Sequence, residues 1–139
     1  MGVPQRPVLV PLLFYIYISD LPLCVSSADL NCDMFADDSS VTAAGKSVSA
    51  VHTKLQTSLQ EVSDWCSSNM MLLNPQKTKS MVITTRQTHP PGLPPLNVLL
   101  KSQVIEQVLE HHHLGVIIDN QNKWQAHINC ITHGVATNV

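Results

Sequence analysis

The 139-residue sequence predicts an α+β fold, in which helices cover one face of a largely antiparallel sheet. Apolar residues recur every three or four positions from residue 48 onward, which is typical of an amphipathic helix. Short apolar stretches bounded by turn residues lie on both sides of that helix, as expected for strands joined by hairpins. Hydrophobic residues make up 44% of the chain and charged residues only 13%, so it has apolar surface to bury and is not a disordered tail.

The first predicted element is a mostly buried helix over residues 8–21. Its apolar side chains occur at helical spacing, at Leu9, Leu12, Leu13, Ile16 and Tyr17. Pro11 is tolerated in a first turn, and Pro22 lies just beyond the end. The apolar run is too short to span a membrane.

A cleaved signal peptide is the competing interpretation of this N-terminal stretch. Arg6 precedes the apolar run, and the small residues 26–28 follow it. Two prolines and Asp20 near the cleavage region count against a signal peptide. We therefore expect an intracellular chain rather than a secreted one.

Two short strands, residues 30–35 and 39–43, are joined by Ala36, Asp37 and Asp38, which predicts a hairpin with acid at its tip. Adjacent carboxylates on a strand point to opposite faces, but in a turn both can approach one site. Mg²⁺ prefers oxygen ligands and commonly takes one or two carboxylates, so the two aspartates are candidate metal ligands. The alternative is a pair that only stabilises the turn through local hydrogen bonds.

A long amphipathic helix is predicted over residues 47–68. Its apolar stripe consists of Val48, Val51, Leu55, Leu59, Val62 and Cys66. Ser47 or Ser49 can cap the start, and Asn69 can end the helix in the left-handed conformation. We expect the acidic hairpin to pack beneath this helix.

The remaining predicted elements are short. They are extended segments at residues 71–74, 80–84 and 114–118, a hairpin of residues 98–100 and 104–108, an irregular proline-rich loop over residues 87–95, and a helix over residues 124–133. A polar bend at residues 75–79 brings Lys77 and Lys79 close together.

Charge and composition exclude several classes of function. With 8 Lys+Arg, 10 Asp+Glu and a net charge of -2, the chain is no self-sufficient nucleic-acid binder. The four cysteines include no C-x-x-C pair, which predicts reduced, partly buried thiols. Aromatic residues make up 4% of the chain, and core packing accounts for Phe14, Tyr17 and Phe35 at least as well as stacking on bases. The histidines at 111–113 are interpreted as a solvated run, with a zinc site shared with His127 or His133 as the alternative.

Several short motifs occur in one order along the chain. They are Gly2-Val3-Pro4-Gln5, Pro11-Leu12-Leu13-Phe14, Tyr17-Ile18-Ser19-Asp20-Leu21-Pro22, Phe35-Ala36-Asp37-Asp38, Trp65-Cys66 with Asn69, Leu72-Leu73-Asn74, Lys77-Thr78-Lys79 and Leu114-Gly115-Val116. Together they resemble the reverse transcriptase of non-LTR (LINE-type) retrotransposons, from Gly2 to about His133. Each motif alone is weak, and their common order makes the resemblance specific.

The resemblance implies a palm-like antiparallel sheet: residues 1–118 would be a partial palm with a primer-grip-like segment, and residues 119–139 the start of a thumb-like region. Asp37 would be a direct ligand and Asp38 the flanking acid for two Mg²⁺ (or Mn²⁺) ions, which serve nucleotidyl transfer in the intact family. Lys77 would neutralise or protonate the leaving phosphate. Lys79 is the competing candidate, and a solvated surface lysine is the alternative for either.

The resemblance also implies partners and binding residues. The partners are an RNA template, a DNA primer and dNTPs, with no membrane. The implied substrate-binding residues are Pro4, Gln5, Phe35, Leu114 and Gly115.

The chain departs from the family pattern in three places. A further catalytic aspartate on a strand upstream of Pro-Gln is not among these residues. Arg6 and Pro7 stand where the family usually has Gly-Ser, and Val10 stands where a glycine is usual. We therefore expect poor Mg²⁺ binding and an inactive isolated chain. The alternative function is a noncatalytic interaction domain, or the secreted product of a degenerate reading frame, in which the acidic hairpin is only a turn.

Overall fold

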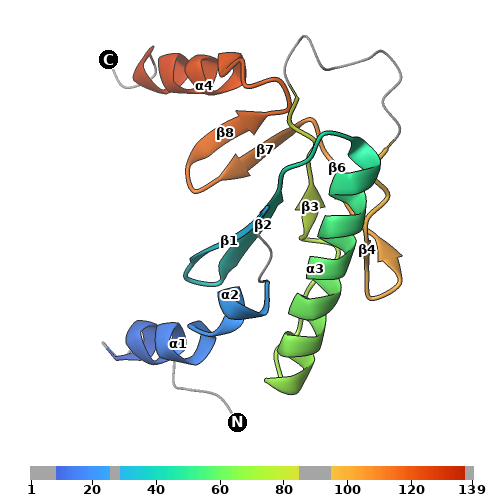
Figure 1. The fold of residues 1–139 in the computed structure, drawn as a ribbon. Coiled ribbons are helices and arrows are strands. Elements are labelled where there is room, and N and C mark those ends of the chain that lie inside the picture. The colour runs from blue at the N-terminus through green and yellow to red at the C-terminus, as the bar shows by residue number, and fades with distance from the viewer. Residues whose placement is uncertain (1–8, 26–28, 85–94, 137–139) are drawn as a thin grey trace. The chain divides into compact units, whose positions relative to one another are not determined.

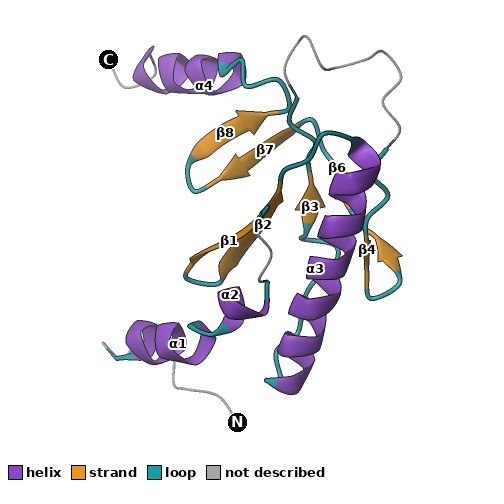
Figure 2. Ribbon diagram, in the orientation of Figure 1, coloured by secondary structure: helices purple, strands orange, loops and turns teal. Residues whose placement is uncertain are grey.

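The structure, a computed structural model, describes residues 9–25, 29–84 and 95–136. The chain divides into two compact units, Met1–Leu73 with Val98–Ser102, and Asn74–Asn97 with Gln103–Val139. Figures 1 and 2 show the order of the elements along the chain. No helix in the described ranges is both long enough and apolar enough to cross a membrane.

The first unit contains two short helices, a pair of strands, one long helix and one further short strand. They are α1 (Val10–Ile18), α2 (Leu21–Cys24), β1 (Leu30–Phe35), β2 (Asp38–Ala43), α3 (Val48–Ser68) and β4 (Leu99–Leu100).

The single helix predicted over residues 8–21 is present as two helices, α1 and α2. The chain breaks at Ser19, whose Oγ donates to the Ile16 carbonyl at 2.8 Å, and Pro22 lies in the first turn of the second helix. The predicted burial is wrong, because Ile18 is the one buried residue of α1. Most large side chains around it are exposed: Leu9, Leu12, Leu13, Tyr15, Ile16 and Tyr17. Apolar residues surround the whole helix, and one edge meets the core.

The predicted hairpin at residues 30–43 is confirmed, except that Asp38, which was predicted in the turn, is the first residue of β2 and pairs with Phe35. β1 and β2 are antiparallel and paired from Leu30↔Ala43 to Phe35↔Asp38. Alternate residues of β1 are half-buried, and these pack against the core of the first unit together with Val41 of β2: Leu30, Cys32 and Met34. The hairpin also contacts α3 through β2, as predicted. The hydrophobic alternation therefore decides which face of the hairpin is inside.

The predicted long helix is confirmed as α3. Ser47 Oγ accepts from the Ala50 N–H at 3.2 Å and caps its start. The left-handed residue after its end is Met70, with φ 54°, and not Asn69 as predicted. Asn69 keeps φ at -97° and donates from Nδ2 to the Trp65 carbonyl at 3.0 Å. The Met71 N–H then reaches the Cys66 carbonyl at 2.8 Å, which closes a Schellman motif.

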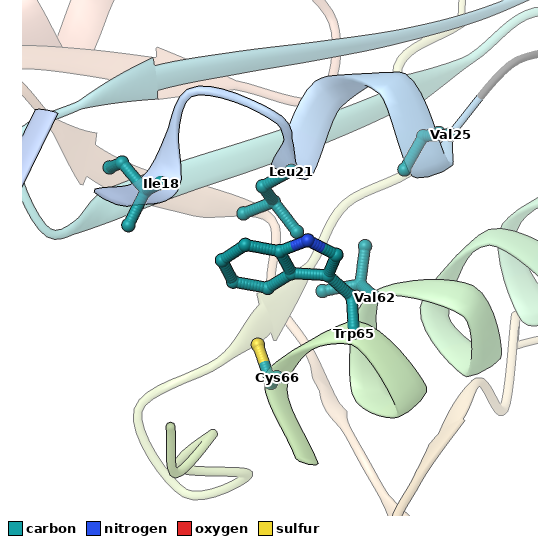
Figure 3. Close-up of a cluster of buried hydrophobic side chains, with 6 residues drawn as sticks. All are labelled: Ile18, Leu21, Val25, Val62, Trp65 and Cys66. Carbon is teal, nitrogen blue, oxygen red and sulfur yellow. The ribbon is translucent and has the colours of Figure 1, made fainter. Parts of the chain in front are cut away.

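Six buried side chains form one hydrophobic cluster in the first unit: Ile18, Leu21, Val25, Val62, Trp65 and Cys66. Figure 3 shows Leu21 of α2 over the indole ring of Trp65 from α3. Tyr17 meets the same indole edge-on, with ring centroids 6.4 Å apart. Further along α3, the Gln56 amide pairs with both backbone groups of Leu99 in β4, at 2.9 and 2.8 Å. The helix α3 thus contacts both the core and β4.

The second unit consists of short strands and one helix. They are β3 (Lys79–Ser80), β5 (Gln103–Val104), β6 (Glu106–Gln107), β7 (Glu110–His113), β8 (Val116–Asp119) and α4 (Gln125–Ala136). α4 packs on β8 and confirms the predicted C-terminal helix, with bounds shifted by a few residues.

The predicted combination of helices and strands is confirmed. The described strands form separate two-stranded sheets and not one largely antiparallel sheet; the pairs β1–β2 and β7–β8 are antiparallel, and β3–β6 is parallel. The hairpin predicted around residues 101–103 is confirmed by the pair β4–β5.

Individual strand predictions in this part of the chain were also inaccurate. Residues 71–74 form no strand, the segment at 80–84 is reduced to Lys79–Ser80, and the segment at 104–108 is interrupted by the buried Ile105. The predicted strand at 114–118 is β8, shifted to residues 116–119. Its partner β7 was not predicted, because Glu-His-His-His has no apolar alternation. Most of the predicted loop at 87–95 lies outside the described residues.

Candidate functional site

The two predicted acids lie at the closed end of the β1–β2 hairpin. Ala36 and Asp37 form a two-residue turn, and Asp38 is the first residue of β2, opposite Phe35. Both aspartates are exposed. The turn therefore places one carboxylate beyond the strands and the next on the first strand position, both open to solvent.

Ala36 adopts a left-handed conformation, with φ 52°. An L-residue pays roughly 1–2 kcal/mol for this conformation, which glycine would adopt freely. Strained backbone of this kind tends to occur at functional sites. The acidic turn is thus held in a shape that its own sequence does not favour.

The strand pairing decides which side chains accompany the acids. Residues directly opposite each other in an antiparallel pair lie on the same face, so Phe35 and Asp38 share the outer face of the hairpin with Asp33. Phe35 is 64% exposed and Tyr17 is 46% exposed, so their assignment to the core is wrong. Phe14 does pack against the core, as predicted. The outer face of β1 points away from the core, which explains the exposure of Phe35.

Carboxylate oxygens are suitable ligands for Mg²⁺. The described ranges contain no group of three or more His, Cys, Asp or Glu residues placed to hold a metal ion. The hairpin tip therefore contributes two acids, which is part of a metal site.

The histidines of the alternative zinc site, residues 111–113 with His127 or His133, belong to the second unit. The His111 and His113 rings stack with centroids 6.5 Å apart, on one side of β7. His127 of α4 instead accepts from the Ile117 N–H at Nδ1, at 3.4 Å.

The two candidate lysines have different surroundings. Asn74 organises the bend before them: its carbonyl accepts from the N–H groups of Lys77 and Thr78, at 3.2 and 3.1 Å. The Lys77 side chain on this bend is exposed. Lys79 lies in β3, opposite Glu106 of β6, and its ammonium forms an ion pair with that carboxylate. Lys77 belongs to the second unit and Asp37 to the first.

Leu114 and Gly115 form the turn between β7 and β8. Both have positive φ, 49° and 81°, which is the pattern of a tight two-residue hairpin turn. A side chain added at Gly115 would meet no atom within 4 Å, so this turn is open. The other two predicted substrate-binding residues, Pro4 and Gln5, lie outside the described residues.

Asp119, at the end of β8, is an organising residue that was missed in the sequence. Its carboxylate accepts backbone N–H bonds from Gln121, Lys123 and Trp124, at 2.9, 3.1 and 2.8 Å. These hydrogen bonds hold the pKa of Asp119 below its ordinary value, and the bond from the Lys123 N–H has the largest effect. The run Asp119-Asn120-Gln121-Asn122 was the available signal, because aspartate bonds to nearby backbone in loops.

All four cysteines carry free thiols. Burial is the main cause that raises the pKa of Cys24, Cys32 and Cys66 above its ordinary value. These three belong to the first unit and Cys130, which is exposed, to the second. Protonated thiols are poor nucleophiles, so none of the three is a candidate catalytic residue.

Comparison with known proteins gives one family. The family described as reverse transcriptase (RNA-dependent DNA polymerase) matches residues 1–118. The RNA-directed DNA polymerase from mobile element jockey of Drosophila melanogaster is 28% identical over 143 residues, covering 99% of this chain and 15% of the relative. The probable RNA-directed DNA polymerase from transposon BS of the same species is 28% identical over 137 residues, covering 94% and 15%.

The jockey polymerase of Drosophila funebris is 24% identical over 143 residues, covering 99% of this chain and 15% of the relative. The chain thus spans 15% of the length of these curated relatives. No solved structure matches.

Proposed function

The chain belongs to the reverse transcriptase (RNA-dependent DNA polymerase) family, and from this premise we propose that its acidic hairpin is part of a nucleotidyl-transfer site. The substrates of the complete site are a DNA primer and dNTPs. The site extends the primer by copying an RNA template. Asp37 is the direct metal ligand and Asp38 the flanking acid. The 139 residues alone are inactive, because the upstream aspartate that the resemblance implies is not among them.

The observation that carries this proposal is the geometry of the hairpin tip. Asp37 projects from a two-residue turn whose first residue, Ala36, has φ 52°. A turn that served only to reverse the chain would be more stable with glycine at that position. The strain is understandable if the position of the carboxylate matters more than the stability of the turn.

The donor set fits a divalent cation in part. Asp37 and Asp38 offer hard, exposed carboxylate oxygens of the kind that Mg²⁺ and Mn²⁺ bind. When bound, such ions supply Lewis-acid stabilisation of the charge that develops in phosphoryl transfer. The proposed task of the hairpin is to hold its two carboxylates at fixed positions for that purpose.

Lys77 is the proposed partner of the leaving phosphate, rather than Lys79. The Lys79 ammonium is already paired with the Glu106 carboxylate across β3 and β6. Lys77 projects from an exposed bend that Asn74 orders through backbone hydrogen bonds. No carboxylate in the described part of the chain forms an ion pair with the Lys77 ammonium, so this cation is better suited to meet a polyphosphate.

A chimeric polymerase tests the proposal. The chain is fused to the upstream fingers and palm segment of an intact relative, Arg6→Gly, Pro7→Ser and Val10→Gly are introduced, and primer extension on RNA is measured with Mg²⁺ or Mn²⁺. Asp37→Ala is expected to abolish extension, because a metal ligand is lost. Asp33→Ala is the matched control, since Asp33 lies on the same strand face away from the tip. It is expected to retain activity.

The lysines are tested in the same chimera. Lys77→Ala is expected to lower the extension rate roughly 10²-fold, the low end of what one general acid contributes. Lys79→Ala is expected to leave the chemical step intact. A chimera that extends primers equally well with Asp37→Ala would show that the acidic hairpin is only a turn, and would favour a noncatalytic interaction domain.

A further inference from the structure

One side chain ties the open end of the β1–β2 hairpin to α3. Lys54 of α3 places its Nζ 2.6 Å from Asp29 Oδ2 and donates to the Ala44 carbonyl at 3.0 Å. Asp29 directly precedes β1, and Ala44 directly follows β2. The Ala44 N–H also donates to the Asp29 carbonyl at 3.1 Å. The lysine therefore bridges both strands at the position next to their first pair.

The hairpin needs such an anchor to hold its tip in place. A two-stranded sheet is at best marginally stable alone in water. Its inner face packs on the core, but its outer face is polar and solvated along Asn31, Asp33 and Thr42. The tip lies about 17 Å from the base, five residue steps along β1. Any rotation at the base is therefore amplified at Asp37.

We propose that Lys54 is a positioning residue for Asp37, a role that rests on the proposed function of the hairpin. It acts by fixing the base of the hairpin to α3, which limits where the carboxylate can lie. It does not touch substrate, because its ammonium already binds a carboxylate and a carbonyl. Its side chain is also only 29% exposed, against 60% for Asp29.

The chimeric polymerase separates positioning from catalysis. Lys54→Met keeps the aliphatic stem and removes the ammonium, and is expected to lower kcat about fivefold, the upper range for one ion pair at the surface. The KM for dNTP should stay unchanged, since no substrate contact is lost. Lys54→Arg keeps charge and donors and should restore most of kcat. Lys46→Met, at an exposed lysine in the loop between β2 and α3, is the matched control without effect.

Hydrogen exchange on the complete 139-residue chain gives a second readout. Lys54→Met should increase amide exchange in β1 and β2 about fivefold, while the amides of Val62 and Trp65 in α3 keep their protection. A contribution to general stability would instead lower protection throughout the first unit. Equal loss in the hairpin and in α3, or no loss in either, overturns the positioning role.

The outcomes distinguish the two proposals. If Asp37→Ala abolishes extension while Lys54→Met matches the parent chimera in kcat, the positioning role of Lys54 fails and the proposed function stands. If Asp37→Ala leaves extension intact, the proposed function fails and the role of Lys54 fails with it. A loss of kcat in Lys54→Met that Lys54→Arg reverses supports both.

Discussion

The β1–β2 hairpin of the first unit and the β7–β8 hairpin of the second use the same architecture with different means. Each joins two antiparallel strands by a two-residue turn that contains positive φ. The first turn puts an alanine, Ala36, in the left-handed region and an acid next to it. The second puts both Leu114 and Gly115 there and carries no charge. Each turn thus holds one residue with a side chain in the left-handed region, Ala36 or Leu114, and only the first does so beside an acid.

The strands of the two hairpins also differ in their side chains and in what those side chains pack against. β1 alternates half-buried and exposed residues, and its inner face packs on a core built around Trp65. β7 is a run of glutamate and three histidines, and the buried residue of this hairpin is Ile117 of β8. The first hairpin is held by hydrophobic packing and the Lys54 anchor. In the second hairpin, β7 is held by its pairing with β8, and β8 packs against α4.

The largest expected effect concerns the hydrophobic cluster around Trp65, on which the first hairpin packs. Trp65→Ala should destabilise the first unit by about 3–5 kcal/mol, since it removes a buried aromatic side chain. Trp124→Ala, at a tryptophan that is 44% exposed, is the matched control in the second unit and should cost much less. Hydrogen exchange measured by NMR should show loss of protection in β1–β2. Equal loss of protection in β7–β8 would contradict a role for Trp65 specific to the first unit.

A matched pair of substitutions tests the backbone strain at one left-handed position of each turn, Ala36 and Gly115. Gly115→Ala should destabilise its hairpin by about 0.5–1 kcal/mol, because φ 81° penalises an L-residue even though a Cβ would meet no atom within 4 Å. Ala36→Gly should stabilise its hairpin by about 0.5 kcal/mol, the strain relieved less the added chain entropy. Urea denaturation of the two variants measures both changes. The same sign for both would refute the comparison.

Alkaline pH should weaken the first unit more than the second. Burial raises the pKa of Cys24, Cys32 and Cys66 above the ordinary 9.0. The unfolded chain therefore releases these protons first, and stability present below pH 9 is lost as the pH rises through the folded values. Denaturation midpoints under reducing conditions from pH 7 to about 10 measure the loss. Cys66→Ala should make the dependence shallower, and an unchanged slope would rule out Cys66 as a cause.

The smallest expected effect lies in the second unit at acid pH. Hydrogen bonds from backbone N–H groups, of which the bond from Lys123 has the largest effect, lower the pKa of Asp119 below its ordinary 3.8. The stability they confer is present above that pH and is lost as the pH falls through the lower, folded value. Exchange of the β8 amides, followed from pH 5 to about 2.5, measures the loss. With Asp119→Asn the acid dependence should flatten, and a variant that keeps it would point to another carboxyl.

Elements with a clear repeating pattern were predicted well from the sequence. The stripe from Val48 to Cys66 predicted α3, whose cap is Ser47, one of the two serines proposed. Two short strands joined by turn residues predicted the hairpin with Asp37 at its tip. The same pattern failed for α1, whose spacing predicted a helix but not that most of it would be exposed. Periodicity reports which residues share a face. It does not report what covers that face.

The candidate site shows the same division. The sequence indicated Asp37, Asp38 and a choice between two lysines, and the family match supports the resemblance on which that choice was made. The ion pair of Lys79 with Glu106 could not be predicted, because it depends on the parallel pairing of β3 and β6, which are 27 residues apart at this contact. The exposure of Phe35 likewise follows from which face of β1 meets the core.

The sequence by itself determined local features of this protein, because these depend on neighbours a few residues away: the span of α3, a serine cap at its start and the acidic hairpin. Only the tertiary structure decided the anchoring of the hairpin base by Lys54, 25 residues from Asp29, and the orientation of Phe35 to solvent. It also divided the strands among separate small sheets. Such features depend on contacts between distant segments, and the pattern of a single segment carries no record of its partner.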